Sequence, residues 1–153
     1  MIQIKGIDHV AINVRNLEHA KEFYVRIVGL SITQREPSTP GVEYYLDCGP
    51  SLINLVQAQD MSKSHTFEND GVGANHFSLR IHSKDFEPMI KRLEDMKISI
   101  EWAKKKEKSW SLGFADLDGN KLEVTSWPLE DGIPPDRRIK EVYDGTTKTW
   151  TKY

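Results

Sequence analysis

The chain has 153 residues and a nearly balanced charge, with 21 Lys and Arg against 23 Asp and Glu. This balance argues against a nucleic-acid partner or an anionic membrane surface, because both require a basic face. The single cysteine, Cys48, excludes an intrachain disulfide and fits a reducing compartment. No apolar run approaches the roughly 18 residues that cross a bilayer. We therefore expect a soluble cytoplasmic protein.

The first half of the chain predicts a β-α-β-β-β module over about residues 6–57. Residues 6–15 alternate between apolar and polar side chains, the pattern of a half-buried strand, and His9 lies on the less apolar face. Apolar residues then recur at helical spacing over 17–28, and Gly29 is well placed to end this helix. Three further strands are expected at about 30–32, 42–46 and 51–57, with a loop at 37–41.

The second half repeats this order of elements over about residues 74–127, after a stretch at 58–73 with little periodicity. A strand at 75–81 places His76 on its less apolar face, and a helix is expected at 84–96. Three strands should complete this module, at about 98–100, 110–115 and 121–126.

Chemically distinctive side chains recur at matching positions of the two halves. His9 and Asn54 in the first half correspond to His76 and Glu123 in the second, with almost the same spacing. Glu123 follows the tight-turn signal Asp-Gly-Asn and lies on the less apolar face of the last strand. An internal repeat of this kind implies a pseudo-twofold arrangement in which equivalent positions face each other. Two histidines and a carboxylate would then come together.

Three segments carry a family resemblance, namely DHVAINV, NHFSLRI and FADLDGNKLEV. Together they resemble the vicinal oxygen chelate superfamily, which includes glyoxalase I, extradiol dioxygenases, and fosfomycin- and bleomycin-resistance proteins. The resemblance covers about residues 6–127. It implies an α+β fold in which two βαβββ modules, in a pseudo-twofold arrangement, form a curved-sheet cleft. We expect one domain over residues 1–153, with a C-terminal extension at 128–153, and a homodimer.

The same resemblance implies a metal site. His9, His76 and Glu123 match the metal ligands of the family, and the family's fourth ligand position falls on Asn54. An amide oxygen on a short side chain is a poorer ligand than the Glu or Gln common at that position. Two histidines and one carboxylate with open positions suit Fe(II) or Mn(II), with zinc or nickel as alternatives. Open positions would allow two neighbouring oxygens of a small-molecule substrate to bind.

Other polar residues are candidates for contact with the substrate or for catalysis. Arg80 and His82 share the strand face of His76, and Asn13 shares the strand face of His9. We interpret these three as substrate-binding residues, although simple exposure to solvent would explain Arg80 and His82 equally well. His65, in the loop between the modules, could supply an acid or base, and it joins Asn54 as a candidate catalytic residue.

Three functions fit this set of residues. We expect a divalent-metal-dependent enzyme, with an extradiol-dioxygenase-like oxidoreductase favoured because three protein ligands suffice for it. A glyoxalase-I-like lyase or isomerase is the first alternative, in which the metal polarises neighbouring oxygens and a base moves a proton. A ligand-binding resistance-type protein without metal is the second alternative. Fold alone does not choose among them.

Overall fold

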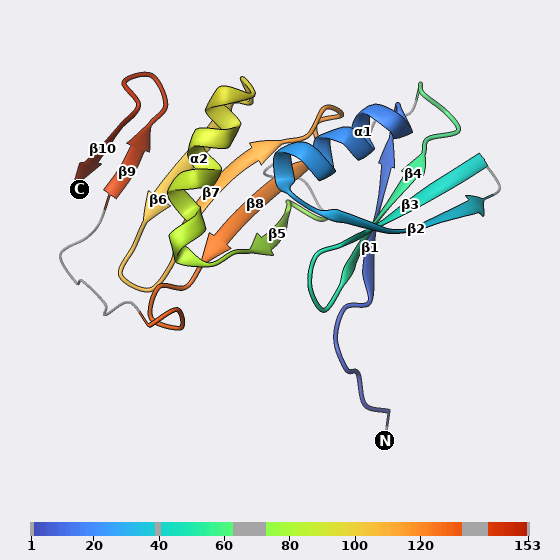
Figure 1. Ribbon diagram of the computed structural model, residues 1–153, viewed down its shortest axis with the longest axis horizontal. Helices are drawn as coiled ribbons and strands as arrows, with labels where there is room; N and C mark the ends of the chain where they lie inside the picture. Colours follow the sequence, from blue (N-terminus) through green and yellow to red (C-terminus); the bar gives the residue numbers. More distant parts are fainter. Residues whose placement is uncertain (1, 39–40, 63–72, 133–140, 153) are drawn as a thin grey trace. The chain divides into compact units, whose positions relative to one another are not determined.

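The computed structural model describes residues 2–38, 41–62, 73–132 and 141–152, and the chain divides into two compact units. The first unit spans Met1–His65 and the second spans Thr66–Tyr153. Each unit contains one sheet and one main helical segment, coloured blue to green and green to red in Figure 1. This mixed α+β architecture confirms the predicted fold class. None of the helices among these described residues is long and apolar enough to cross a membrane.

The first unit has the predicted β-α-β-β-β order. Its sheet has the strand order β1-β4-β3-β2, with β1 parallel to β4 and the other neighbours antiparallel. The elements are β1 (His9–Val14), α1 (Leu17–Phe23), the π-helix η1 (Tyr24–Val28), β2 (Ser31–Ser38), β3 (Gly41–Asp47) and β4 (Leu52–Gln57).

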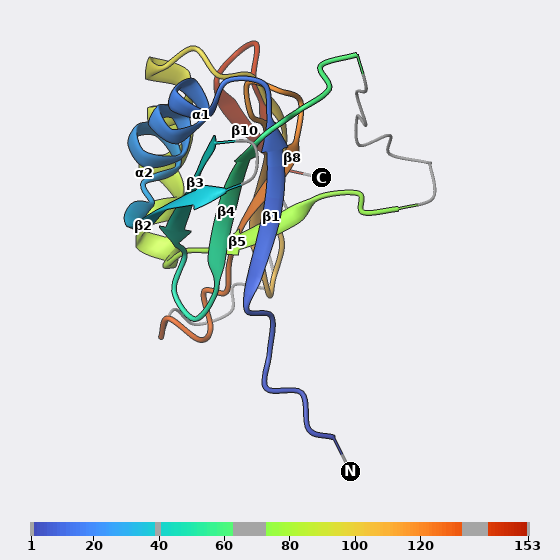
Figure 2. The same ribbon diagram turned by 90° about the vertical axis from the view of Figure 1, so that its right-hand side faces the viewer.

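The helix of the first unit covers one face of its sheet, as Figure 2 shows for α1. Asn16 begins α1 by accepting a hydrogen bond from the backbone N–H of His19 at 3.0 Å. Gly29 ends the helical segment in the left-handed region, with a φ of 94°, as the sequence predicted. The side chains buried between helix and sheet come from both, and they include Phe23, Tyr24, Ile12, Val14, Ile53 and Leu55.

The second unit repeats this order and then adds two strands. Its sheet has the order β10-β9-β6-β7-β8-β5, with β5 parallel to β8 and the other neighbours antiparallel. The elements are β5 (Phe77–Arg80), the 3-10 helix η2 (Ser83–Asp85), α2 (Phe86–Asp95), β6 (Ile100–Lys105), β7 (Trp110–Ala115), β8 (Lys121–Ser126), β9 (Glu141–Asp144) and β10 (Thr149–Lys152).

The turn between β7 and β8 is held by one carboxylate. Asp116 Oδ1 accepts hydrogen bonds from the backbone N–H groups of Asp118 and Asn120, at 2.9 and 2.8 Å. Its Oδ2 accepts a third from the Asn120 side chain at 2.8 Å. Gly119 supplies the positive φ, 88°, that this tight turn requires. The turn therefore fixes the register in which β8 carries Glu123.

The C-terminal extension joins the second sheet, which the sequence did not predict. β9 pairs with β6, and Tyr143 and Trp150 from the extension pack together with ring centroids 5.3 Å apart. Trp150 also lies 6.3 Å from Phe86 of α2. The extension is polar in sequence, but its aromatic residues pack against the apolar core that α2 already provides. Figure 1 shows the β9–β10 hairpin beyond β6, at the opposite edge of the sheet from β5.

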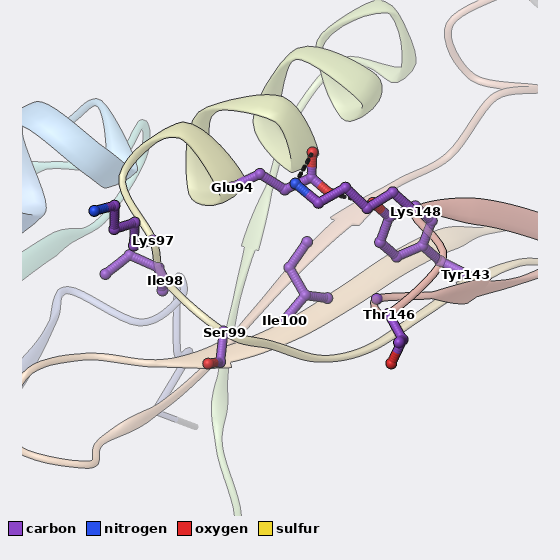
Figure 3. Close-up of a pocket in the computed structure, with 9 residues that line it drawn as sticks. Glu94, Lys97, Ile98, Ser99, Ile100, Tyr143, Thr146 and Lys148 are labelled. Atoms are coloured by element: carbon purple, nitrogen blue, oxygen red, sulfur yellow. Dashed lines mark hydrogen bonds and ion pairs between the residues drawn. The ribbon is translucent and has the colours of Figure 1, made fainter.

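A recess of about 450 Å³ lies between the end of α2 and the β9–β10 turn (Figure 3). Tyr143 donates a hydrogen bond from its hydroxyl to Glu94 at the rim, and Lys148 Nζ lies 3.8 Å from the same carboxylate. Burial, together with the neighbouring Glu94, raises the pKa of Tyr143 to about 12. Glu94 and Tyr143 therefore attach the hairpin to the helix. The predicted metal ligands are not among the residues that line this recess.

Several predicted boundaries were wrong. The strand expected at 98–100 lies later in the chain, at Ile100–Lys105. The expected loop at 37–41 is largely strand, because β2 continues to Ser38 and β3 begins at Gly41. The strand expected at 75–81 is shorter, since β5 covers Phe77–Arg80. His76 therefore directly precedes the strand on which it was placed, and it still faces β8.

Candidate metal and substrate site

The second unit brings His76 and Glu123 together. Residues 77 and 78 at the start of β5 pair with residues 122 and 123 of β8, so the side chain of His76 reaches the Glu123 carboxylate. The distance between His76 Nε2 and Glu123 Oε2 is 2.9 Å. Their side chains are 39% and 18% exposed, so the pair is accessible to a ligand. Two of the three predicted metal ligands thus lie in contact within one unit.

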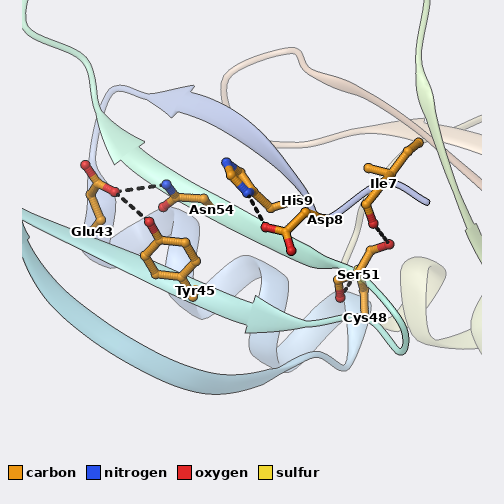
Figure 4. A network of polar contacts seen from close by, with 8 residues as sticks. All are labelled: Ile7, Asp8, His9, Glu43, Tyr45, Cys48, Ser51 and Asn54. Carbon is orange, nitrogen blue, oxygen red and sulfur yellow. Dashed lines mark hydrogen bonds and ion pairs between the residues drawn. The ribbon is translucent and has the colours of Figure 1, made fainter. Parts of the chain in front are cut away.

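Both predicted histidine ligands are oriented by the residue that precedes them. His76 Nδ1 lies 2.7 Å from Asn75 Oδ1, and His9 Nδ1 lies 2.9 Å from Asp8 Oδ2 (Figure 4). For His9, an oxygen acceptor at Nδ1 favours the ring form that carries its proton there, which leaves Nε2 able to bind a metal. For His76, Nε2 is in a hydrogen bond or ion pair with Glu123, and a bound metal would replace the proton between them. The sequence signal is the acceptor-His dipeptide at the start of each module, Asp-His and Asn-His.

The His76–Glu123 contact fits a metal site. Two ligands with bonds of roughly 2.1 Å that meet at a right angle are about 3 Å apart, close to the observed 2.9 Å. The described parts of the chain contain no cluster of three or more His, Cys, Asp or Glu residues placed to hold a metal. His9 belongs to the first unit. The three-residue ligand set of His9, His76 and Glu123 therefore stays a prediction.

On the face of the first sheet away from α1, Asn54 belongs to a polar network (Figure 4). Its Nδ2 donates a hydrogen bond to Glu43 Oε2 at 2.9 Å, and the Tyr45 hydroxyl reaches the same oxygen at 3.4 Å. Burial, followed by the negative charge of Glu43, raises the pKa of Tyr45. The ring of Tyr45 lies edge-on to His9, with centroids 6.3 Å apart. Asn54 and His9 thus lie on the same face of the first sheet, on β4 and β1.

Glu43 fixes the orientation of the Asn54 amide. Asn54 is 5% exposed, and its Oδ1 has no hydrogen-bond partner among the described residues. A reversed amide would place Oδ1 against the Glu43 carboxylate, where two acceptors would repel each other. A buried hydrogen-bond acceptor without a partner destabilises the folded state unless a ligand supplies the missing partner. Sequence reasoning missed Glu43. Strand alternation could have placed it on the same face as Tyr45, but its proximity to Asn54 depends on how β3 pairs with β4.

The remaining predicted residues have other partners or positions. Arg80 forms an ion pair with Glu130, and His82 Nδ1 lies 3.2 Å from Asp131 Oδ1. Glu130 and Asp131 both lie in the turn that follows β8, so this turn supplies the partners of Arg80 and His82. Asn13 is exposed on β1. His65 lies outside the described residues.

Asp131 makes the stability of the second unit dependent on pH. Its carboxylate accepts hydrogen bonds from the Ser83 hydroxyl and backbone N–H, at 2.7 and 2.6 Å, which with His82 lowers its pKa to about 2. Because the pKa of Asp131 is lower in the folded protein than in the unfolded chain, its carboxylate stabilises the folded state at pH values above the unfolded-state pKa. This contribution is lost as the pH falls from about 4 to about 2. We expect Asp131→Asn to be less stable than wild type in urea at pH 5, with the difference vanishing near pH 2. The exposed Asp95→Asn is the control, and an Asp131 effect that is constant with pH would contradict this account.

Comparison with known proteins places these residues in a family context. Residues 6–124 match the family described as "Glyoxalase/Bleomycin resistance protein/Dioxygenase superfamily". The metallothiol transferase FosB of Staphylococcus haemolyticus is 28% identical over 132 residues, which cover 85% of this chain and 89% of that protein. The glutathione transferase FosA of Serratia marcescens is 27% identical over 121 residues, which cover 79% of this chain and 80% of that protein.

A solved structure supports the fold. A variant of the fosfomycin resistance protein FosX of Listeria monocytogenes, complexed with Mn(II) and 1S,2S-dihydroxypropylphosphonic acid, is 17% identical with a TM-score of 0.64. The match covers 84% of this chain and 95% of that chain. At this level of identity the likeness concerns the fold alone, and it agrees with the two β-α-β-β-β units described above.

Proposed function

Because the chain belongs to the glyoxalase/bleomycin resistance protein/dioxygenase superfamily, we propose that it is a divalent-metal-dependent enzyme acting on a small molecule with neighbouring oxygens. The observation that carries the proposal is the 2.9 Å contact between His76 Nε2 and Glu123 Oε2. His9 is proposed as the third ligand, supplied by the same chain or by the second copy in a homodimer. Asp8 and Asn75 hold the two imidazoles in the form that can bind a metal.

The donor set favours a hard or borderline divalent ion. Two imidazoles and a carboxylate suit Fe(II) or Mn(II), and zinc or nickel are acceptable to the same ligands. The Listeria monocytogenes protein of similar fold was complexed with Mn(II), which supports manganese as the first ion to test. When bound, such an ion would act as a Lewis acid toward substrate oxygens. The chain itself supplies the orientation of the ligands and a partly shielded carboxylate.

A thiol transfer is the reaction that the relatives favour. The two similar proteins from Staphylococcus haemolyticus and Serratia marcescens are named a metallothiol transferase and a glutathione transferase. In such a reaction the sulfur of a thiol would form a bond to an electrophilic carbon, for example in an epoxide. The carbon–oxygen bond would break, and the released oxygen would take up the thiol proton. No external oxidant is needed, so this reaction should proceed equally well without air.

A dioxygenase is the second candidate, and the position of Asn54 favours it. The Asn54 amide nitrogen is committed to Glu43, and its side chain is shorter than the Glu or Gln of the family's fourth ligand position. A set of three protein ligands leaves more positions for a substrate and oxygen than a set of four. A dioxygenase would therefore fit this ligand set, but it must consume oxygen.

The experiment that decides is a set of parallel assays on metal-loaded protein. Purified protein is analysed for metal, loaded with Mn(II), Fe(II) or Zn(II), and tested with and without air. The probes are fosfomycin with cysteine or glutathione, methylglyoxal with a thiol, and a panel of catechols with an oxygen electrode. We expect bound metal and thiol consumption that is unchanged without air. Oxygen-dependent loss of catechol would instead establish the dioxygenase, and methylglyoxal turnover the lyase. Absence of bound metal would overturn the proposal.

A further inference from the structure

The face of the second sheet that carries Glu123 also carries a tryptophan. Trp110, on the other face of β7, contacts Phe86 of α2 with ring centroids 5.8 Å apart. Alternation along the strands places Gly113 and Glu123 on the face away from α2. Trp102 of β6 pairs with Gly113, and Gly113 pairs with Glu123, so the three positions form one row across the sheet.

The indole of Trp102 lies over Gly113. A Cβ built on Gly113 would be only 2.4 Å from Trp102 Nε1 and 2.5 Å from Cε2, closer than real side chains ever approach. The indole therefore occupies the space that a side chain at position 113 would fill. The ring therefore lies over β7, and Glu123 is on the neighbouring strand β8, about 4.8 Å away in the direction of the strand pairing. Trp102 remains partly exposed, which leaves indole surface free to contact a ligand.

Most of the basic side chains on this face are already neutralised. Lys121 forms an ion pair with Glu101, as Arg80 does with Glu130. Lys104 Nζ lies 5.8 Å from the centre of the Trp102 ring and forms no ion pair within the described residues. Among the described residues of this face, the surroundings of Glu123 thus offer an aromatic surface and one ammonium group that has no ion-pair partner.

We propose that Trp102 is a substrate-binding residue, and that the substrate carries a flat, unsaturated group beside its neighbouring oxygens. The indole would stack against this group while the oxygens lie toward His76 and Glu123. The absence of a side chain at Gly113 is what allows the indole to lie there. The inference rests on the proposed function, because it names the substrate class of that same site.

Binding measurements on four variants test this role. Mn(II)-loaded wild type, Trp102→Leu, Trp102→Phe, Gly113→Ala and Trp127→Leu are titrated with 4-nitrocatechol and, separately, with glycolate. Both probes present neighbouring oxygens, but only 4-nitrocatechol has an aromatic ring. Trp127 is 38% exposed and serves as the matched control. Aromatic contacts of this kind typically change affinity about 3- to 10-fold.

We expect Trp102→Leu to weaken 4-nitrocatechol binding by this factor and to leave glycolate binding and metal content unchanged. Trp102→Phe should retain most of the affinity, and Gly113→Ala should weaken it because the added methyl group displaces the indole. Equal weakening for both probes, or no weakening in Trp102→Leu, would overturn the inference. If the wild type takes up no metal, the proposed function fails. A Trp102-dependent affinity of the metal-free protein for 4-nitrocatechol would then still support the aromatic contact, and its absence would overturn it.

Discussion

Replacing Glu123 with alanine should abolish stoichiometric binding of a divalent metal ion. The substitution removes the carboxylate oxygen that lies 2.9 Å from His76 Nε2, and the two imidazoles that remain in the proposed ligand set, His76 and His9, cannot hold such an ion tightly. We expect the affinity for Mn(II) to fall by more than about 100-fold, because the partners that merely orient a ligand already account for about 10- to 100-fold. Titration calorimetry and metal analysis after gel filtration measure this loss.

Two control substitutions make the result specific. Asn75→Ala removes the oxygen that lies 2.7 Å from His76 Nδ1 and keeps both His76 and Glu123. It should therefore lower the affinity for the metal by only about 10- to 100-fold. Glu101→Ala removes a carboxylate that is paired with Lys121 in the same unit and should leave metal binding unchanged. Full metal retention in Glu123→Ala would refute the ligand assignment.

Replacing Phe86 with alanine should destabilise the second unit severely. Phe86 is 0% exposed, and its ring contacts both Trp110 of β7 and Trp150 of β10. Truncation of a buried phenylalanine typically costs about 3–5 kcal/mol because it leaves a cavity. That is a large share of the roughly 5–15 kcal/mol by which proteins are stable. Urea unfolding followed by circular dichroism gives the free energy of unfolding directly.

Two other truncations calibrate this measurement. Trp150→Ala removes the contacts of Trp150 with Phe86, Tyr143 and Lys105. Trp110 still covers Phe86, so the cost should be clearly smaller. Leu129→Ala alters a side chain that is 61% exposed and should change stability by less than about 0.5 kcal/mol. If Trp150→Ala costs as much as Phe86→Ala, the extension is a principal part of the core rather than an addition to it.

Local patterns predicted the strands and turns that depend on neighbouring residues. β7 and β8 lie where the alternation at 110–115 and 121–126 placed them, and Gly29 ends the first helical segment as expected. The β9–β10 hairpin was not predictable in this way. Its segment is polar, and the apolar surface that stabilises it belongs to Phe86, more than fifty residues earlier in the sequence. Periodicity within a window cannot reveal a partner at that distance.

The candidate site was predictable to the same extent. His76 and Glu123 could be matched because strand alternation fixes their faces, and the structure places them in contact. The partners of Arg80 and His82 could not be predicted, because Glu130 and Asp131 lie in a turn whose sequence has no periodic signal. The proximity of Glu43 to Asn54 depends on the register between β3 and β4, which the sequence does not state.

The two sheets differ in how their outermost strands resist the addition of another strand. β2 carries Pro37 and an irregularity in its pairing after Ile32, and β10 is only four residues long and contains Lys152. Proline, irregular pairing, short length and lysine are all features that block edge-to-edge association. β1 and β5 are also outermost in their sheets, and neither contains proline or lysine, but β5 has only four residues whereas β1 has six. Of the four outermost strands, β1 is thus the least protected against backbone-mediated association with another strand. β1 carries His9, so self-assembly and the chemistry of this face would be linked.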